Sequence, residues 1–396
     1  MCVEKDVSTD ASFSVKKGVF IMNYERSSII NDNAEYGFNE ADNFQKFLTE
    51  MDRDSTWLEI EKCKEMSVEY AGSSDDIIEG ITDEAFNDTV LNGSHLELKY
   101  NNTSYYVGSS ALPTLKARAG ISGTSLEKLE RKDLSEVLSK CLRVVSGGSL
   151  LRICGDKIRA CHSKNYQALS QSGIFRTART TIEGYSNKIF IRGNWSHDYM
   201  TASWNIMDND VIEAYADMLA NMGVPVNKCE IQTVASICTS DVGTSGATIW
   251  YNISYKNKMV VLGAGSKLNH KGTASISDFS HNLQEVFSSY KKKFFEIEDL
   301  KYVKIKHPVG CIYGLLKKAD LPACLAKETA IRFKTVFGNI ETDGLTLYVM
   351  GVNELLNVAK EKKASVSKLF TYQEKIARII GYDFAKFDRE AELVDL

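Results

Sequence analysis

The side chains whose chemistry is easiest to interpret in this sequence are arginines and lysines near the middle of the chain. Between Ser149 and Leu169, two short apolar runs flank a turn at Gly155-Asp156, and each run carries basic residues. Such side chains beside aromatic rings suit a nucleic acid, because cations contact phosphates and rings stack on unpaired bases. We therefore predict a nucleic-acid-binding surface here. Its expected contact residues are Arg152, Lys157, Arg159, Lys164, Tyr166, Arg176 and Arg179.

The same residues have a second interpretation. They fit a solvated face of a sheet whose charges form ion pairs within the protein, since no motif of a known nucleic-acid-binding fold accompanies them. Composition alone does not separate the two interpretations.

Histidine and cysteine are too scattered to indicate a metal centre. The six histidines form no H-E-x-x-H pattern, and the nine cysteines contain no C-x-x-C pair. Cys161 and His162 are neighbours, and neighbouring side chains of a strand point to opposite faces. The glycines at 263 and 265, followed by Lys267, lack the spacing and the helix of a phosphate-binding loop. We expect no metal, no cofactor and no catalytic residue.

Charge is distributed unevenly although the whole chain has a net charge of only −4. Residues 1–90 contain 21 acidic and 8 basic side chains, whereas residues 116–192 contain 6 acidic and 15 basic ones. The two segments either attract each other within one fold, or the basic one meets a polyanion and the acidic one a basic partner.

The elements that must position the basic residues are a β-hairpin and its neighbours. The alternation over residues 149–160 predicts two strands with an apolar face and a basic face. Ser163 is expected to begin a short helix that carries Tyr166 and Leu169. Residues 132–142 have the spacing of an amphipathic helix, and residues 95–107 read as an earlier hairpin. Further strands are predicted at 188–192, 200–207, 228–237, 247–255 and 259–262.

These patterns predict an α+β fold: a central mixed or antiparallel sheet with hairpins, packed by helices, and a mostly helical C-terminal region. We expect an acidic α/β N-terminal region (1–90), a central α+β domain (91–275) and a helical C-terminal region (276–396). In the first region, a strand is predicted over Val15–Met22, a helix from about Asn39 and a second helix over Ser74–Phe86. No apolar run reaches about 18 residues, so no membrane span is expected. The polar N-terminus lacks the pattern of a signal peptide, which favours the cytoplasm.

Four segments within about residues 91–271 resemble an uncharacterised family of phage- and plasmid-encoded proteins, the phage/plasmid-like proteins. The first segment is a strand that enters a helix, together with the turn that ends this helix. The other three are two polar segments and a turn that contains glycine. They are Tyr106–Leu112 with Ala117–Ile121, Lys157–Tyr166, Ser240–Gly243 and Asn269–Gly272. The resemblance implies a setting rather than a reaction: the cytoplasm of a bacterial host, close to DNA metabolism or host defence. Where the family has cysteine and asparagine-glycine before the late histidine, this chain has Gly263–Ser266.

Three functions follow as hypotheses. The first is a non-enzymatic phage or plasmid accessory protein that binds nucleic acid, DNA in preference to RNA, through the basic hairpin face. The second is an inhibitor of a host defence protein, in which the acidic first 90 residues imitate nucleic acid. The third is a hydrolase or a nucleotidyl-transferring enzyme whose motifs are concealed. It would require Asp, Glu or His side chains that converge in one pocket.

Overall fold

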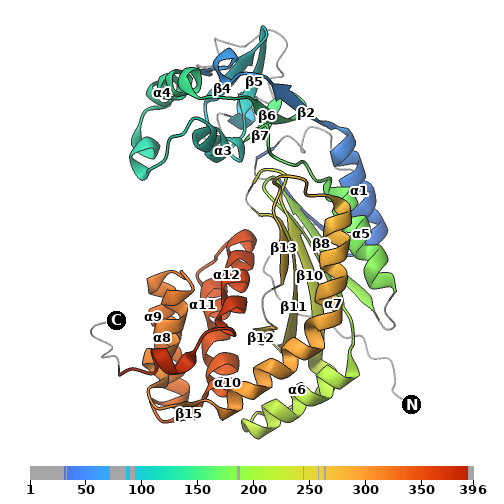
Figure 1. Cartoon of the computed structure of the whole chain (residues 1–396), viewed down its shortest axis with the longest axis vertical. Coiled ribbons are helices and arrows are strands. Elements are labelled where there is room, and N and C mark those ends of the chain that lie inside the picture. The colour runs from blue at the N-terminus through green and yellow to red at the C-terminus, as the bar shows by residue number, and fades with distance from the viewer. Residues whose placement is uncertain are drawn as a thin grey trace.

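The computed structural model describes residues 31–32, 34–71, 86–89, 94–184, 188–243, 245–256, 258–262 and 265–390. The strand expected over Val15–Met22, and the helix expected over Ser74–Phe86 except for its last residue, lie outside this part of the chain. The described residues form two larger sheets with helices packed against each (Figure 1), and a third sheet of two short strands, β14 (Lys304–Ile305) and β15 (Thr342–Asp343). The α+β class and the mostly helical C-terminal region predicted from the sequence are confirmed.

The first sheet, called the small sheet here, has six strands in the order β2-β6-β7-β5-β4-β3. Its strands are β2 (Ser55–Ile60), β3 (Ser67–Tyr70), β4 (Leu96–Tyr100), β5 (Thr103–Val107), β6 (Ser149–Cys154) and β7 (Lys157–Ser163). Two helices, α3 (Ala111–Arg118) and α4 (Arg131–Val144), share a core with this sheet. Leu134, Leu138 and Leu142 supply the buried stripe of α4, as their spacing predicts. We call the small sheet with α3 and α4 the small lobe.

The second sheet, the large sheet, follows the order β1-β8-β9-β10-β11-β12, with β13 also paired to β11. Its strands are β1 (Glu35–Phe38), β8 (Ile189–Ser196), β9 (Met200–Asn205), β10 (Ile231–Thr239), β11 (Ala247–Tyr255), β12 (Lys258–Val261) and β13 (Ser266–Leu268). All of its pairings are antiparallel.

Helices lie on both faces of the large sheet. Tyr251 stacks on Tyr290 of α7 (Ile276–Glu298), with 4.6 Å between ring centroids. The preceding Trp250 meets Phe370 of α12 (Val366–Ile379) at 5.0 Å. Because successive strand residues point to opposite faces, α7 and α12 cover opposite sides of the sheet. Helices α1 (Ala41–Arg53), α5 (Gln171–Glu183) and α6 (Asn209–Asn221) lie with α7 (Figure 1).

The C-terminal helices extend the core of the large sheet. Helices α8 (Pro308–Lys318), α9 (Ala323–Phe337) and α11 (Leu355–Glu361) belong to one continuous cluster that also contains residues of α1, α5 and α7. Together with the large sheet, these helices form what we call the large lobe. Within the part of the chain that is described, no helix is long and apolar enough to cross a membrane.

The predicted region boundaries do not coincide with these lobes. Strands β2 and β3 lie before residue 90, yet they pair with β6 and β4 in the small sheet. Strand β1 pairs with β8 in the large sheet. The helices after residue 276 share a core with that sheet. Pairing between residues far apart in sequence has no local sequence signal, so a linear division misses it.

The segment after the central hairpin also departs from prediction. Residues 164–170 contain a turn, an isolated bridge at Tyr166 and irregular chain rather than the short helix expected from Ser163. The helix begins instead at Gln171, where the Ser170 hydroxyl accepts a hydrogen bond from the amide of Gly173 at 3.0 Å. Arg176 and Arg179 therefore lie on helix α5, in the large lobe, and not on the hairpin.

Candidate functional site

The central hairpin has the two faces that its alternation predicts, but neither is open to solvent. Leu151, Ile153 and Ile158 enter the core of the small lobe. The opposite face carries Arg152 and Lys157, and it is covered by the large lobe and by acidic residues from the start of the chain. The expectation of an exposed basic face is therefore wrong. Desolvated cations require carboxylate partners, and the fold supplies them.

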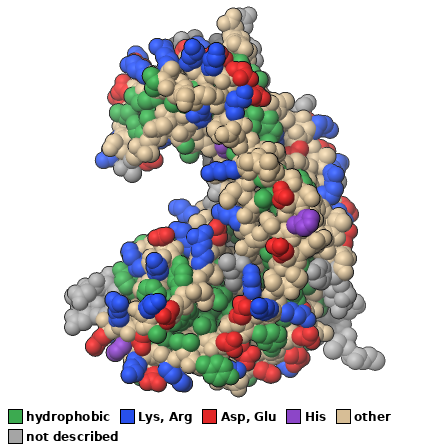
Figure 2. Space-filling view, viewed as in Figure 1, with side chains coloured by type: hydrophobic (Ala, Val, Ile, Leu, Met, Phe, Trp, Pro, Cys, Tyr) green, Lys and Arg blue, Asp and Glu red, His purple; other side chains and the backbone are tan. Residues whose placement is uncertain are grey.

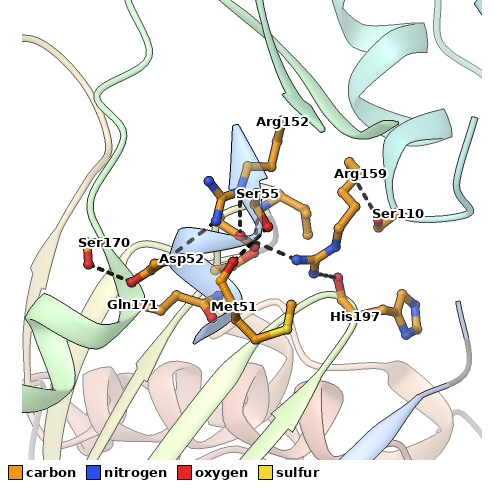
Figure 3. Close-up of polar contacts among 12 residues, drawn as sticks. Met51, Asp52, Ser55, Ser110, Arg152, Arg159, Ser170, Gln171 and His197 are labelled. Atoms are coloured by element: carbon orange, nitrogen blue, oxygen red, sulfur yellow. Dashed lines mark hydrogen bonds and ion pairs between the residues drawn. The ribbon is translucent and has the colours of Figure 1, made fainter. Parts of the chain in front are cut away.

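Asp241 is the partner of two of these cations. It lies in the turn between β10 and β11 of the large lobe, and its Oδ2 is 3.2 Å from Nε of Arg152 and 3.5 Å from Nη1 of Arg159. All three side chains are about 95% buried. Figure 3 shows the two arginines converging from separate strands, with Asp52 beside Arg152 and His197 beside Arg159.

A local irregularity of the hairpin allows both arginines to reach one carboxylate. Arg152 pairs with Ala160, whereas the next residue, Ile153, pairs with Ile158, so Arg159 is an extra residue on β7. Such a bulge redirects a side chain out of the regular alternation. Arg159 thereby lies over the Trp195 ring at 5.1 Å, and its guanidinium donates to the carbonyl of His197.

The arginines determine the charge of Asp241. Burial alone would raise the pKa of this carboxyl, but Arg159 and Arg152 outweigh that effect and hold its pKa below the ordinary value. Asp241 is therefore ionised at neutral pH and links the two lobes as a buried anion between two cations.

Beside this ion pair, three rings stack in parallel across the same contact. Tyr166 lies between His162 of β7, at a centroid distance of 3.8 Å, and His270 of the large lobe, at 5.1 Å. Trp57 of β2 approaches Tyr166 at 5.6 Å and has the Arg152 guanidinium over its ring at 5.0 Å. Burial lowers the pKa of both histidines, because a charged imidazolium is poorly solvated there.

Backbone contacts complete the contact between lobes. His162 Nε2 lies 3.3 Å from the carbonyl oxygen of Asp241, and the Tyr166 hydroxyl donates to the carbonyl of Ser240 at 3.3 Å. The amide of Gln167 donates to the carbonyl of His270 at 3.0 Å. We call this set of contacts the junction: Arg152, Arg159, His162 and Tyr166 on the hairpin side, and Ser240–Gly243 with His270 on the large lobe.

Lys157 lies in a separate buried cluster. Its side chain is 1% exposed, and its ammonium group forms ion pairs with Asp88 and, at 3.6 Å, with Asp32. Burial lowers the pKa of this lysine, and the charge of Asp32 opposes the effect. Asp32 also accepts a hydrogen bond from the amide of Ser109 at 2.6 Å. Lys157 thus fastens the beginning of the described chain to the small sheet.

The remaining predicted contact residues are dispersed. Lys164 is partly exposed and pairs with Glu59 and Glu61. Arg179 pairs with Asp42 at 2.6 Å and with Glu183 of its own helix. Arg176 is exposed on α5 and forms no ion pair with a described residue. The structure thus brings Arg152, Arg159 and Tyr166 together and separates the other four.

These ion pairs account for much of the uneven charge. Arg152, Lys157, Lys164 and Arg179, all from the basic segment, each pair with at least one carboxylate from the first 90 residues. The first of the two charge interpretations, mutual attraction within one fold, therefore describes these residues.

The junction contains residues to which the sequence assigned no chemistry. Asp241, His270 and Trp57 are spread over more than 200 positions, and no spacing links them to the hairpin. Ser240–Gly243 and Asn269–Gly272 had been singled out only for their resemblance. Together with Lys157–Tyr166, these segments are now seen to touch one another. Thr114, just after the first segment, accepts a hydrogen bond from the amide of Cys161 at 2.9 Å.

A wide cleft opens between the two lobes beside the junction, and Figure 2 shows Lys and Arg side chains on its inner walls. In Figure 1, α3 borders the cleft on the small lobe, α12 borders it on the large lobe, and β13 lies near its inner end. These elements and the loop after β13 (269–275) carry several basic residues and a single acidic one, Glu374. The basic residues are Lys116, Arg118, Lys267, Lys271, Lys368, Lys375 and Arg378.

The described residues contain no group of three or more His, Cys, Asp or Glu side chains able to hold a metal ion. The described cysteines are free thiols, and burial raises the pKa of Cys161 and of Cys238 to about 12. Such thiols are almost entirely protonated at neutral pH, and a protonated thiol is a poor nucleophile.

The fold and this site define an α+β protein of two lobes that a buried ionic and aromatic junction holds on either side of a basic cleft. No family model, curated protein or solved structure matches the chain.

Proposed function

We propose that the protein is a non-enzymatic accessory protein of a phage or plasmid that binds nucleic acid in the cleft between its lobes. The observation that carries this proposal is the charge of the elements that border the cleft. Seven basic residues and one acidic residue lie on α3, β13, the loop after β13 and α12, whereas the whole chain has a net charge of −4. Concentration of one sign in a concave region of an acidic protein favours a polyanionic ligand.

This proposal moves the binding surface away from the central hairpin. Arg152, Lys157 and Arg159 are buried and paired, so they support the cleft rather than contact phosphates. The contacts are assigned to Lys116 of α3, Lys271 of the loop after β13 and Lys368 of α12. Lys271 and Lys368 are exposed, and Lys116 is half-buried. DNA is preferred to RNA as the ligand because the phage/plasmid-like resemblance implies DNA metabolism.

The test is a binding titration with fluorescently labelled single-stranded and duplex DNA at two salt concentrations. Wild type is expected to bind more weakly as salt rises, because binding to phosphates releases counterions. The variant K116E/K271E/K368E is expected to lose at least tenfold in affinity at low salt. Its salt dependence for duplex should become shallower by roughly 0.9 per lost phosphate contact.

A matched control separates the cleft from overall charge. The variant K292E/K306E/K334E makes the same change in net charge at exposed lysines outside the elements that border the cleft. It is expected to bind nearly as well as wild type. Equal losses in both variants, or no binding by wild type at low salt, would contradict the proposal.

The inhibitor alternative has no supporting observation among the described residues. Asp42, Asp52, Glu59 and Glu61 in the acidic segment are engaged in ion pairs within the chain. A partner would have to compete with these pairs before it could use the carboxylates.

A further inference from the structure

Two histidines of the junction face each other across the ring of Tyr166. His162 lies on strand β7 of the small lobe, His270 lies in the loop after β13 of the large lobe, and Tyr166 separates them. His270 is also held from two sides, because its Nδ1 lies 3.1 Å from the carbonyl oxygen of Gln167 and its Nε2 lies 3.4 Å from Oγ1 of Thr239. Both rings therefore lie in the contact between the lobes.

We propose that the junction is a pH-sensitive contact that fixes the small lobe against the large lobe at neutral pH and loosens in mild acid, so that the cleft widens. This inference concerns the arrangement of the lobes alone. It holds whether or not nucleic acid is the ligand of the cleft.

Burial favours the neutral forms of the two histidines, and the charge of Asp241 opposes this effect without outweighing it. The β10–β11 turn contributes Asp241, the hairpin contributes Arg152 and Arg159, and the loop after β13 contributes Lys271, whose backbone forms a bridge with Tyr166. Both arginines already pair with Asp241, and Arg152 also pairs with Asp52. Two further positive charges in this contact would share carboxylates that are already paired, and they would repel each other across Tyr166.

The direction of the pH effect follows from the lowered histidine pKa values. Burial lowers the pKa of His162 and of His270 below the ordinary value of 6.5. A histidine released from the junction thus binds a proton at a higher pH than one held within it. The closed contact has its full stability above pH 6.5 and loses stability as the pH falls below that value toward the lowered pKa values.

The packing of the β10–β11 turn against His162 explains why this loss of stability acts on the contact between the lobes. Gly243 has a φ of +83°, and a β-carbon there would lie 2.9 Å from Cε1 of His162. The turn is thus packed directly against the ring, with no space to accommodate a tightly hydrated imidazolium. Protonation of His162 is therefore unfavourable unless the turn moves away from the hairpin.

The experiment is small-angle X-ray scattering of the full chain without nucleic acid at pH 7.5 and pH 5.5. The radius of gyration of wild type is expected to rise reversibly at pH 5.5. The variant H162F/H270F keeps two rings beside Tyr166 but cannot be protonated, so its radius should not change with pH. The control variant H281F removes an exposed histidine of α7 and should respond as wild type does.

Further measurements keep the test decisive. Circular dichroism at both pH values establishes that each variant is folded. If H162F/H270F does not fold, H162Q/H270Q replaces it, because glutamine retains a hydrogen-bonding amide in place of the imidazole. An unchanged wild-type radius, or a variant that expands as wild type does, would overturn the proposal. Loss of DNA binding in the cleft variant would leave this result untouched.

Discussion

The carboxylate of Asp241, in the turn between β10 and β11 of the large sheet, lies 3.2 Å from Nε of Arg152 on β6 of the small sheet, although the two residues are 89 positions apart. Arg159 approaches the same oxygen from the neighbouring strand at 3.5 Å. Because all three groups are buried, their interaction is weakly screened by solvent. This contact fixes the turn after β10 to the central hairpin, and the relative position of the lobes depends on it.

Removal of the charge of Asp241 should destabilise the protein strongly. Asp241→Asn leaves two buried guanidinium groups without their shared anion, and we expect a loss of about 3–5 kcal/mol in the free energy of unfolding. Urea denaturation measures this loss. Asp210→Asn is the control, because Asp210 is 78% exposed and its ion pair with Lys291 is solvated. It should cost less than about 1 kcal/mol, and similar losses at both positions would contradict the assignment.

A pair of glycine substitutions tests the close approach of the turn to His162. Gly243 and Gly223 have similar backbone angles, with φ of +83° and +75°, but no atom lies within 4 Å of a β-carbon at Gly223. Gly223→Ala should therefore cost about 1–2 kcal/mol for the left-handed conformation alone. Gly243→Ala adds a clash with the ring and should cost roughly 1–3 kcal/mol more. Thermal unfolding of both variants measures this difference in stability. Equal losses of stability in the two variants would show that the turn can move away from the His162 ring at no cost in free energy.

Loss of the buried Lys157 charge should be more damaging than loss of a partly exposed lysine. Lys157→Met removes the cation that faces Asp32 and Asp88, and two buried carboxylates then lie near each other. We expect a loss of about 3–5 kcal/mol in denaturant unfolding. Lys164→Met breaks ion pairs with the exposed Glu59 and Glu61 and should cost less than about 1 kcal/mol. A larger loss of stability for Lys164→Met than for Lys157→Met would contradict the burial of Lys157.

Cysteine reactivity should separate exposed from buried thiols. Cys229 and Cys324 are exposed, whereas Cys161 and Cys238 are buried with pKa values raised to about 12. At pH 8, iodoacetamide should modify the first pair within minutes and leave the second pair unmodified until the protein is denatured. Peptide mass spectrometry reports each site. Rapid native modification of Cys161 would show that the small sheet opens readily.

Local sequence patterns determined much of the secondary structure. The helix predicted from about Asn39 is α1, and Phe44, Phe47, Leu48 and Met51 form its buried face. The alternation around Gly155 predicted the hairpin β6–β7, and the spacing over residues 132–142 predicted α4. These features depend on interactions between residues close in sequence, which periodicity records.

Only the tertiary structure decided what the basic residues do. Arg152, Lys157 and Arg159 have the alternation of an exposed strand face, and that alternation is the same whether water or another lobe covers the face. Their burial depends on Asp241, Asp32 and Asp88, which belong to distant segments of the chain. The sequence by itself therefore determined the hairpin and its two faces. The fold decided that its basic face joins two lobes, because partners across a contact of this kind have no fixed spacing along the chain.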